Sequence, residues 1–366
     1  MSVVVKNIID VKDASAFAHD ITKKHFGNIS KSSRVIIKPN ITAPKLPSTG
    51  TTTHHEVIIG VLEALPGFNN VKIVESDATS SDFKENIQGW GYSFLENYSN
   101  AALINLSKEP VKKKIILYGI RNSYEVEIPE LLFNYDILIN LPVMKTHILT
   151  GVSLGIKNLF GLLPCKNKSL YHINIHDILF AIYKRFQSDL TILDGIVGME
   201  GMGPIFGEPA NAKMILAGDD VALLDAVAAR IMGFDPYSIA YLNSALKNRV
   251  GSCRLPEINV QDQRLNFERM PSLPVQIIRA LLPEGVSPET ILEQIDAPTQ
   301  TIKNLPTFIE SLISKGIIIR EDEKLHLNTA RLDILFSLFP ETQEKLFTHI
   351  HNKSSIEQFT SGVGEI

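Results

Sequence analysis

The chain has 366 residues, of which 44% are hydrophobic and 21% are charged, and its formal net charge is −4. This length suits a large α/β domain with a second unit, and the apolar content excludes a chain that is disordered throughout. A charge this close to balance, with no long run of one sign, argues against a general nucleic-acid-binding protein.

The chain contains two cysteines, Cys165 and Cys253, and no CxxC pair. Neither a disulfide framework nor a cysteine-ligated iron–sulfur cluster is therefore expected. The N-terminal stretch lacks the basic flank and cleavage pattern of a signal peptide, and no apolar run reaches the roughly 18 residues of a membrane span. We therefore expect a cytoplasmic protein without a transmembrane helix.

Apolar runs typical of strands alternate with helical patterns through the first two thirds of the chain. Buried strands are predicted at 34–40, 71–76, 136–142 and 190–196, and helices at 54–67 and 220–234. In the last helix Asp220 is a plausible N-cap, and Gly233 stands near the end. The alternation predicts an α/β core domain over residues 1–265, with a mostly parallel sheet flanked by helices.

The remaining residues, 266–366, have a different pattern. Helical stretches are predicted at 287–295 and 305–316, the second with Pro306 near its start and Gly316 past its end. Two extended arms around a charged turn follow, which completes the outline of a winged-helix-like domain. Because its charge is mixed and the turn is acidic, we expect it to form a homodimer or bind a protein or peptide, rather than DNA.

The first candidate site residues leave the strand predicted at 34–40. Lys38 and Asn40 flank Pro39, so they place a charge and an amide at the edge of a sheet, where α/β proteins bind their ligands. They are candidate substrate-binding residues. The alternative is a capped turn with a solvated lysine.

A run of threonines and histidines precedes the first predicted helix. The hydroxyls of Thr52 and Thr53, with backbone N–H groups, would suit an anion at the start of that helix. Helix capping accounts for one threonine but not for His54 beside His55. We therefore expect at least one of these histidines to be functional, with His54 the candidate.

Carboxylates end two further strands. Glu75 and Asp77 lie two residues apart on one face, where they would hold a metal, transfer a proton, or simply end the strand and cap a helix. Asp194 ends the strand predicted at 190–196. The glycine-rich loop after it is expected to form a wall of the site, with Asp194 as a candidate catalytic residue.

The segment 145–161, KTHILTGVSLGIKNLFG, is helix-forming in appearance but rich in glycine. Lys145 and His147 are expected in the loop after the strand predicted at 136–142. Glycines near Lys157 would let the backbone approach a bound ligand closely. A lysine among apolar neighbours loses its proton more readily, so Lys157 is a candidate nucleophile or covalent anchor, with Asn158 beside it contacting substrate.

Two further histidines, His172 and His176, are four residues apart. If their segment is helical they share one face, and that spacing can hold a divalent metal such as nickel, iron or zinc. The alternative is a pair of surface histidines.

These segments together resemble a known family, the domain of unknown function 362. Its hallmarks stand here as IIKPNI, TTTHHEVIIGVLEAL, INLPVMKTH, GVSLGIKNLFGLLP, LDGIVGMEGMGP and LAGDDVALLDAVAARIMG, in the family's order over residues 30–250. Many relatives carry a cysteine-rich ferredoxin-like segment, whose cysteines this chain lacks.

A fainter similarity is to the lactate racemase family, which holds a nickel-pincer nucleotide covalently on a lysine. That resemblance implies His147 as an acid/base, Lys157 as the cofactor anchor and His172 or His176 as a metal ligand. It also implies His54 or His55 as the opposing acid/base.

We predict a metal- or cofactor-dependent enzyme, an isomerase or oxidoreductase at a C–H centre, that acts on a small carboxylate or phosphate. The alternatives are a non-catalytic anion-binding protein and a tailoring enzyme whose C-terminal domain docks a peptide or carrier protein. The predicted site comprises catalytic Lys157, His147, His54 and Asp194, substrate-binding Lys38, Asn40, Thr52, Thr53, Lys145 and Asn158, and metal-binding His172 and His176.

Overall fold

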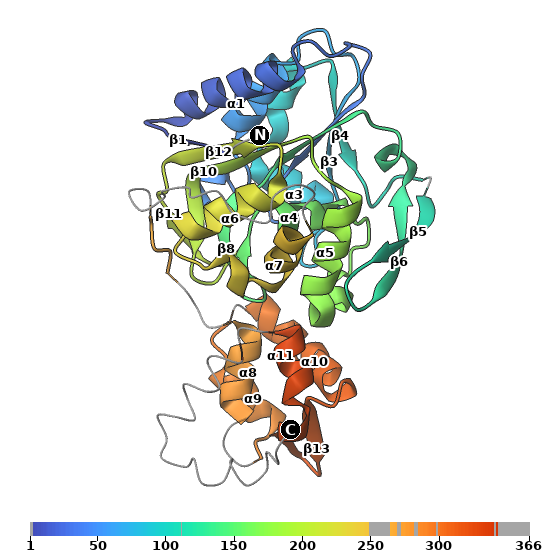
Figure 1. Cartoon of the computed structure of the whole chain (residues 1–366), viewed down its shortest axis with the longest axis vertical. Helices are drawn as coiled ribbons and strands as arrows, with labels where there is room; N and C mark the ends of the chain where they lie inside the picture. The colour runs from blue at the N-terminus through green and yellow to red at the C-terminus, as the bar shows by residue number, and fades with distance from the viewer. Residues whose placement is uncertain are drawn as a thin grey trace. The chain divides into compact units, whose positions relative to one another are not determined.

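The computed structural model describes residues 3–110, 112–248, 264–268, 272–281, 285–297, 299–339 and 342. The chain divides into two compact units, one of residues 1–237 and 241–270 and one of residues 238–240 and 271–366 (Figure 1). The boundary between 270 and 271 lies five residues from the predicted one between 265 and 266.

Ten described strands of the first unit form one mixed, mostly parallel sheet. The main strands, in spatial order, are β1 (Val4–Asn7), β12 (Met214–Gly218), β10 (Leu190–Glu200), β7 (Ile137–Leu141), β2 (Val35–Pro39), β3 (Val71–Glu75) and β4 (Ala101–Asn105). From β10 to β4 every neighbouring pair is parallel, whereas β12 pairs antiparallel with both β1 and β10. The predicted α/β fold with a mostly parallel sheet is confirmed.

Three short strands extend the sheet beyond this path. They are β8 (Val143–His147), β9 (Gly151–Ser153) and β11 (Glu208–Ala210). Strand β8 begins directly after Pro142, which has no N–H to donate and ends β7. It continues beside β10, so Lys145 and His147 lie in a strand, and the predicted loop is wrong. Asp194 likewise lies inside the long strand β10 and not at its end.

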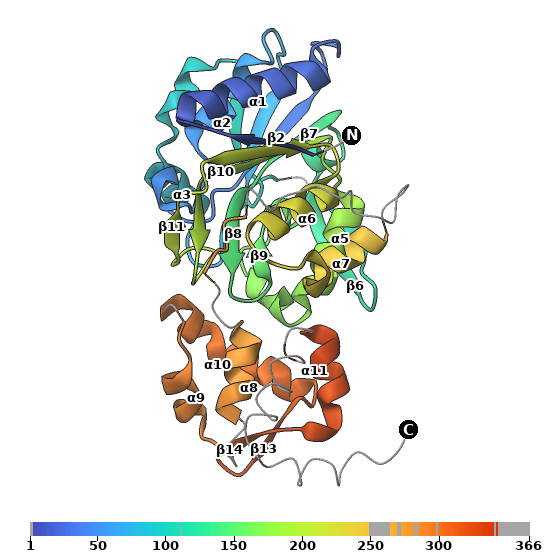
Figure 2. The same cartoon turned by 60° about the vertical axis from the view of Figure 1, so that its left-hand side comes forward.

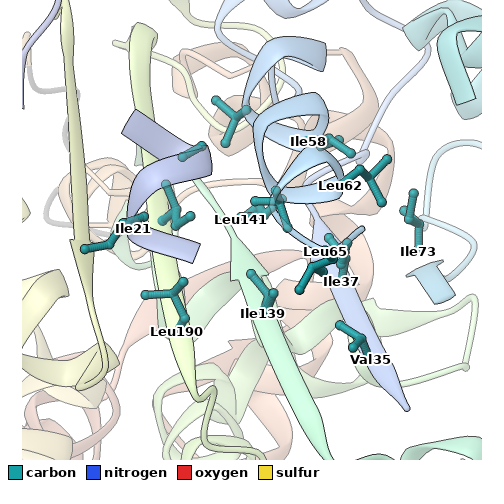
Figure 3. Packing of buried hydrophobic residues seen from close by; sticks show 14 of the residues in the cluster. Ile21, Val35, Ile37, Ile58, Leu62, Leu65, Ile73, Ile139, Leu141 and Leu190 are labelled. Atoms are coloured by element: carbon teal, nitrogen blue, oxygen red, sulfur yellow. The ribbon is translucent and has the colours of Figure 1, made fainter. Parts of the chain in front are cut away.

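Helices cover both faces of this sheet. Helices α1 (Val11–Phe26) and α2 (His55–Glu63) pack together on one face, and α5 (Ile175–Arg185), α6 (Val221–Ile231) and α7 (Ala240–Lys247) lie on the other (Figure 2). Between the sheet and the first pair, isoleucine, leucine and valine side chains form a continuous buried core (Figure 3). Burial on both faces accounts for the mainly apolar sequences of β2 and β7, in which Lys38 and Asn140 are the polar exceptions.

Local sequence signals set several helix ends. Asp220 accepts a hydrogen bond from the backbone N–H of Leu223, and Gly233 follows the helix with a φ of 86°, so the predicted caps of α6 are confirmed.

The glycine-rich segment 145–161 looked helix-forming in the sequence, but it holds β8, β9 and only one short α-helix, α4 (Gly155–Asn158). The described part of this unit also contains α3 (Phe83–Trp90) and short 3-10 helices at Pro47–Thr49, Tyr92–Asn97, Glu130–Leu132, Leu159–Leu162, Lys168–Asn174 and Pro236–Ser238.

A separate hairpin of β5 (Lys112–Tyr118) and β6 (Ser123–Pro129) lies beside α5. The carboxylate of Asp177 holds its turn, accepting hydrogen bonds from the backbone N–H groups of Ile120, Arg121 and Asn122. The Asp177 side chain thereby fixes the hairpin to the first turn of α5.

The second unit contains helices and one hairpin, as predicted. Its elements are α8 (Leu273–Leu281), α9 (Pro288–Gln294), α10 (Thr299–Ser314), β13 (Ile318–Glu321), β14 (Lys324–Leu327), a 3-10 turn (Thr329–Arg331) and α11 (Leu332–Leu338). Val286 pairs with Leu325 as a third short extended segment, which completes the order of a winged-helix-like fold. Pro306 lies inside α10 and not near its start, because that helix begins six residues before Leu305. Within the described residues, no helix combines the length and the apolar character that crossing a membrane requires.

Candidate functional site

Four lysines that are far apart in the sequence come together where β2, β3, β8 and α4 meet. We call Lys38, Lys145, Lys157 and Lys168 the lysine cluster. After burial itself, the charge of Lys157 lowers the pKa of Lys145, and that of Lys168 lowers the pKa of Lys157. Besides burial, the charge of Lys38 also lowers the pKa of Lys145 and of Lys168, so each of the four amines lies within electrostatic reach of at least one other.

Lys38 is neutralised within the protein. Its Nζ lies 2.6 Å from Oε2 of Glu75, and both side chains are buried. Oxygens of the same carboxylate accept the backbone N–H groups of Ile41 at 3.1 Å and Ser76 at 3.0 Å. Burial lowers the pKa of Lys38, and Glu75 opposes that effect. A buried ion pair with these added hydrogen bonds is a structural feature of the fold.

Three buried asparagines connect β2, β7 and α4. Nδ2 of Asn40 donates to Oδ1 of Asn158 at 2.9 Å, and Nδ2 of Asn158 donates to Oδ1 of Asn140 at 2.8 Å. Asn140 in turn donates to the carbonyl of Gly155 at 3.0 Å. The predicted residues Asn40 and Asn158 are therefore brought together. Asn140 was missed, although one asparagine in the otherwise apolar strand ILINL was a signal.

Lys145 is fully buried, and its hydrogen bonds are used inside the protein. Its Nζ donates to Oδ1 of Asn40 and the carbonyl of Thr51, both at 2.8 Å, and to the carbonyl of Pro204 at 3.4 Å. Burial and the charge of Lys157 lower the pKa of Lys145 to about 7. Lys145 thus ties β8 to two loops, while its charge contributes to the local field.

The threonine hydroxyls also have partners in the protein. Thr53 Oγ1 donates to the carbonyl of Leu141 at 2.8 Å and accepts the backbone N–H of Asn40 at 2.8 Å. Thr52 Oγ1 donates to the carbonyl of Lys45 at 2.9 Å. Both residues shape the turn before α2, and a role in binding substrate stays a prediction.

His54 and Asp194 form a buried pair with each other. Oδ2 of Asp194 lies 2.9 Å from Nδ1 of His54 and accepts the backbone N–H of His54 at 2.7 Å. Burial disfavours the charged imidazole, but the charge and hydrogen bond of Asp194 outweigh it and raise the pKa of His54. The pair holds the start of α2 against β10, and its catalytic role stays a prediction.

Lys157 differs from the rest of the lysine cluster. Its side chain is partly exposed, and its Nζ lies 4.7 Å from the ring centroid of Phe160. Among the residues that the structure describes, none accepts a hydrogen bond from this amine. Burial and the charge of Lys168 lower the pKa of Lys157 to about 8. Lys168 itself donates to Ser76 Oγ and to the carbonyls of Asp77 and Cys165.

Three histidines lie within electrostatic reach of Lys157 or of one another. Burial and the charge of Lys157 lower the pKa of His172 to about 4 and hold that of His147 well below its usual range. Nδ1 of His147 accepts the backbone N–H groups of Leu149 at 3.0 Å and Thr150 at 3.3 Å, so its proton is on Nε2 in the neutral ring.

His176 is buried, and neither ring nitrogen has a hydrogen-bond partner among the described residues. Its ring stacks on that of Tyr241, with centroids 6.0 Å apart, and burial lowers its pKa to about 4. His172 lies in the 3-10 helix before α5 and His176 in α5 itself, so the condition for a shared face, one helix through both residues, is not met. Within the described residues, no three histidine, cysteine or acidic side chains are grouped as a metal site.

The assignment of His172 and His176 as metal ligands stays a prediction.

Two glycines in the segment 145–161 leave room for internal groups of the protein. A Cβ on Gly161 would lie 2.6 Å from Oε1 of Glu75 and 2.8 Å from Nζ of Lys38. A Cβ on Gly155 would lie 2.5 Å from Cγ2 of Val221 and 2.7 Å from Oδ1 of Asp225. These buried side chains account for both glycines by themselves, and a close approach of the backbone to a bound molecule stays a prediction.

Asp225 from α6 was missed by the sequence analysis. Its carboxylate accepts the first backbone N–H groups of α4, those of Gly155 at 2.7 Å and Ile156 at 2.8 Å. Burial raises the pKa of Asp225 to about 7, despite these two hydrogen bonds. It holds the turn that carries Lys157 and Asn158.

The other acids near the lysine cluster are engaged as well. Asp77 Oδ1 accepts the backbone N–H of Phe83 at 2.9 Å and Nδ2 of Asn105 at 3.2 Å, whereas Glu75 pairs with Lys38. Of the two alternatives for this carboxylate pair, the geometry supports a strand end followed by a helix cap.

A family model described as "Domain of unknown function (DUF362)" matches residues 35–230, more than half of the chain. The chain belongs to the DUF362 family. All candidate site residues, and Asp225, lie within the matched DUF362 region. The predicted family membership is confirmed.

This DUF362 protein is similar to the thylakoid-associated protein sll1697 of Synechocystis. The two are 26% identical over 321 residues, which cover 83% of this chain and 90% of that protein. A match of this length is longer than the first unit and therefore includes residues of both units.

Two solved structures overlap with part of the DUF362 protein. One is the lactate racemase apoprotein from Thermoanaerobacterium thermosaccharolyticum, with 14% identity and a TM-score of 0.43 over 63% of this chain and 57% of that chain. The other is a protein from Thermotoga maritima, with 13% identity and a TM-score of 0.39 over 66% of this chain and 59% of that chain. Similarity at this level carries no information about the reaction.

Proposed function

We propose that this protein is an enzyme that binds a small anionic molecule beside Lys157 and moves a proton with His147. The observation that carries this proposal is the unpaired amine of Lys157. In the lysine cluster, Lys38, Lys145 and Lys168 each donate to two or three acceptors of the protein, whereas no described residue accepts from Lys157. An amine without an acceptor, on a residue that is itself partly exposed, is suited to a group that comes from solution.

The charge of the ligand follows from its surroundings. The carboxylates of Glu75, Asp77, Asp194 and Asp225 are all engaged by groups of the protein. The groups left to meet a ligand are the amine of Lys157 and imidazole nitrogens, in a field dominated by lysines. A carboxylate or phosphate is favoured there, and a cation is disfavoured.

His147 suits proton transfer because one of its nitrogens is fixed. With Nδ1 held by two backbone amides, Nε2 is the nitrogen that can exchange a proton with a ligand. Burial and the positive charges nearby keep the ring neutral at ordinary pH, so Nε2 carries a hydrogen that it can donate to a ligand oxygen.

Thermal unfolding in the presence of phosphate or acetate tests the binding step. A ligand that binds the folded state raises the Tm in proportion to the logarithm of its concentration once the site is saturated. We expect this rise in the natural protein and in Lys184→Met, and its loss in Lys157→Met. Lys184 is the matched control, because its amine also lies over a phenylalanine ring, that of Phe180, but is exposed. An equal rise in Lys157→Met would show that the anion binds elsewhere.

Solvent exchange separates an enzyme from a binding protein. Small carboxylic acids are incubated with the protein in deuterium oxide, and incorporation at the carbon beside the carboxylate is followed by NMR. We expect His147→Gln to slow the exchange by about 10²–10⁴-fold while the phosphate-dependent rise in Tm remains. If no acid in the panel exchanges but phosphate still binds, the protein is a non-catalytic anion-binding protein.

A further inference from the structure

The unpaired amine of Lys157 also has the surroundings of a nucleophile. Apart from burial, the one charge that shifts its protonation markedly is the positive charge of Lys168, and no carboxylate stabilises the ammonium form. The nearest acids are engaged, Glu75 by Lys38 and Asp225 by the amides of α4. If Lys157 served only as a fixed positive charge, we would expect a hydrogen-bond acceptor beside its amine. The described residues place no acceptor there.

The position of Lys157 is fixed at both ends. Its backbone belongs to α4, whose first turn is held by Asp225, and its side chain lies over the ring of Phe160. A lysine held in this way, with a neutral amine available, attacks carbonyl carbons readily. Its neighbour His147 offers Nε2 for proton transfer.

We propose that Lys157 forms an imine with the carbonyl carbon of a small oxo acid. This inference rests on the proposed function, since the positive lysine cluster attracts the carboxylate and the aldehyde or ketone carbon of the same molecule meets the amine. The imine proposal names a narrower substrate class than the proposed function. An anion without an aldehyde or ketone group would bind the site but would not react with Lys157.

The step balances without any external reagent. The amine nitrogen bonds to the carbonyl carbon, and one proton passes from nitrogen to the carbonyl oxygen to give a carbinolamine. The carbon–oxygen bond then breaks, the second proton leaves the nitrogen, and oxygen departs as water. The imine draws electrons from the adjacent carbon, so a proton on that carbon becomes acidic enough to pass to water, while Nε2–H of His147 hydrogen-bonds the substrate and stabilises the charge that develops. Imine formation thereby supplies the activation that the proposed proton transfer needs.

Trapping with sodium borohydride tests the proposal directly. The full chain is incubated with pyruvate, and hydride reduction turns any imine into a stable secondary amine. Intact-mass measurement and peptide mapping then locate the adduct. We expect one dominant adduct on Lys157, its loss in Lys157→Arg, and its retention in Lys184→Arg. Lactate, which has no ketone, should give no adduct and should compete with pyruvate.

The remaining outcomes separate the two proposals. If pyruvate leaves no adduct but phosphate still raises the Tm through Lys157, the imine is excluded and the anion site stands. If neither occurs, both proposals fail. An adduct spread equally over exposed lysines such as Lys184 and Lys166 would show unspecific chemistry and overturn the assignment to Lys157. Circular dichroism of Lys157→Arg confirms that any lost adduct does not reflect a lost fold.

Discussion

Lys145 and Lys157 lie in the same cluster, but their amines have different surroundings. Lys145 is fully buried and hydrogen-bonded to Asn40, Thr51 and Pro204, whereas Lys157 has no acceptor among the described residues. Removing the first amine leaves buried acceptors unpaired, and removing the second relieves an unfavourable charge. Opposite effects on stability are therefore expected.

We predict that Lys157→Met raises the free energy of unfolding at neutral pH by about 1–3 kcal/mol, because each unit of pKa shift corresponds to about 1.4 kcal/mol. Lys145→Met should lower it by about 1–3 kcal/mol for each buried acceptor that loses its donor. Urea unfolding at pH 7 measures both changes. A destabilised Lys157→Met would mean that the amine has a partner in the folded state.

The pH dependence of Lys157 has a definite sign. Its folded pKa of about 8 lies below the ordinary value of 10.5, so the unfolded chain binds the proton more tightly between these values. The stability of the natural protein relative to Lys157→Met should therefore increase as the pH rises from about 8 to about 10.5.

His54 should behave in the opposite way. Its folded pKa is raised above 6.5 by Asp194, so the pair stabilises the fold fully below that value and less as the pH rises through the folded pKa. We predict that the stability difference between the natural protein and His54→Gln is largest at about pH 5 and shrinks towards about pH 9. Denaturant unfolding at several pH values measures it. A difference that does not change with pH would mean that His54 stays neutral beside Asp194.

At the scale of elements, Gly161 lies just beyond α4 and faces the Lys38–Glu75 ion pair. The space that this pair occupies explains why the residue is a glycine. Gly161→Ala would place a methyl group within 2.6 Å of Oε1 of Glu75. Because neither partner of a buried ion pair can move away freely, we predict a loss of about 1–3 kcal/mol in the free energy of unfolding.

Gly218→Ala, at the end of β12, is the matched control. The nearest atom to its added methyl group lies at 3.6 Å, an ordinary contact distance. Its free energy of unfolding should change by less than about 1 kcal/mol. If both variants lose the same stability, the loss belongs to glycine replacement in general and not to the ion pair.

At the scale of the whole molecule, the division into two units predicts that they are separable. The first unit has its own buried core between the sheet, α1 and α2 (Figure 3). We predict that a chain ending at Met270 folds and still shows the phosphate-dependent rise in Tm. Circular dichroism and thermal unfolding check this. Unfolding of the shortened chain would mean that the core depends on the second unit, which includes the short stretch 238–240.

The winged-helix-like second unit remains a candidate for binding a partner. We propose that it mediates a homodimer or docks a protein or peptide, as its mixed charge suggested. If it forms a homodimer, light scattering should show the full chain as a dimer and the chain ending at Met270 as a monomer. A monomeric full chain would leave docking of another protein as its role.

What the sequence determined by itself follows from local patterns. Unbroken apolar runs identified β2, β7 and part of β10, the spacing of apolar residues identified α2 and α6, and Asp220 and Gly233 identified the ends of α6. These signals act within one element, so they can be read without knowing what packs against it. The same holds for the family membership, which rests on motifs in a fixed order.

Only the tertiary structure decided which polar side chains are free. From the sequence, Lys157 was a candidate catalytic residue and Lys38 and Lys145 were candidate substrate-binding residues, and Gly155 and Gly161 suggested a nearby ligand. The fold pairs Lys38 with Glu75, buries Lys145 on Asn40, fills the glycine space with Glu75 and Asp225, and leaves Lys157 without an acceptor among the described residues. The partners come from strands and helices tens of residues away, and hydrogen bonding between such distant groups leaves no periodic trace in the sequence.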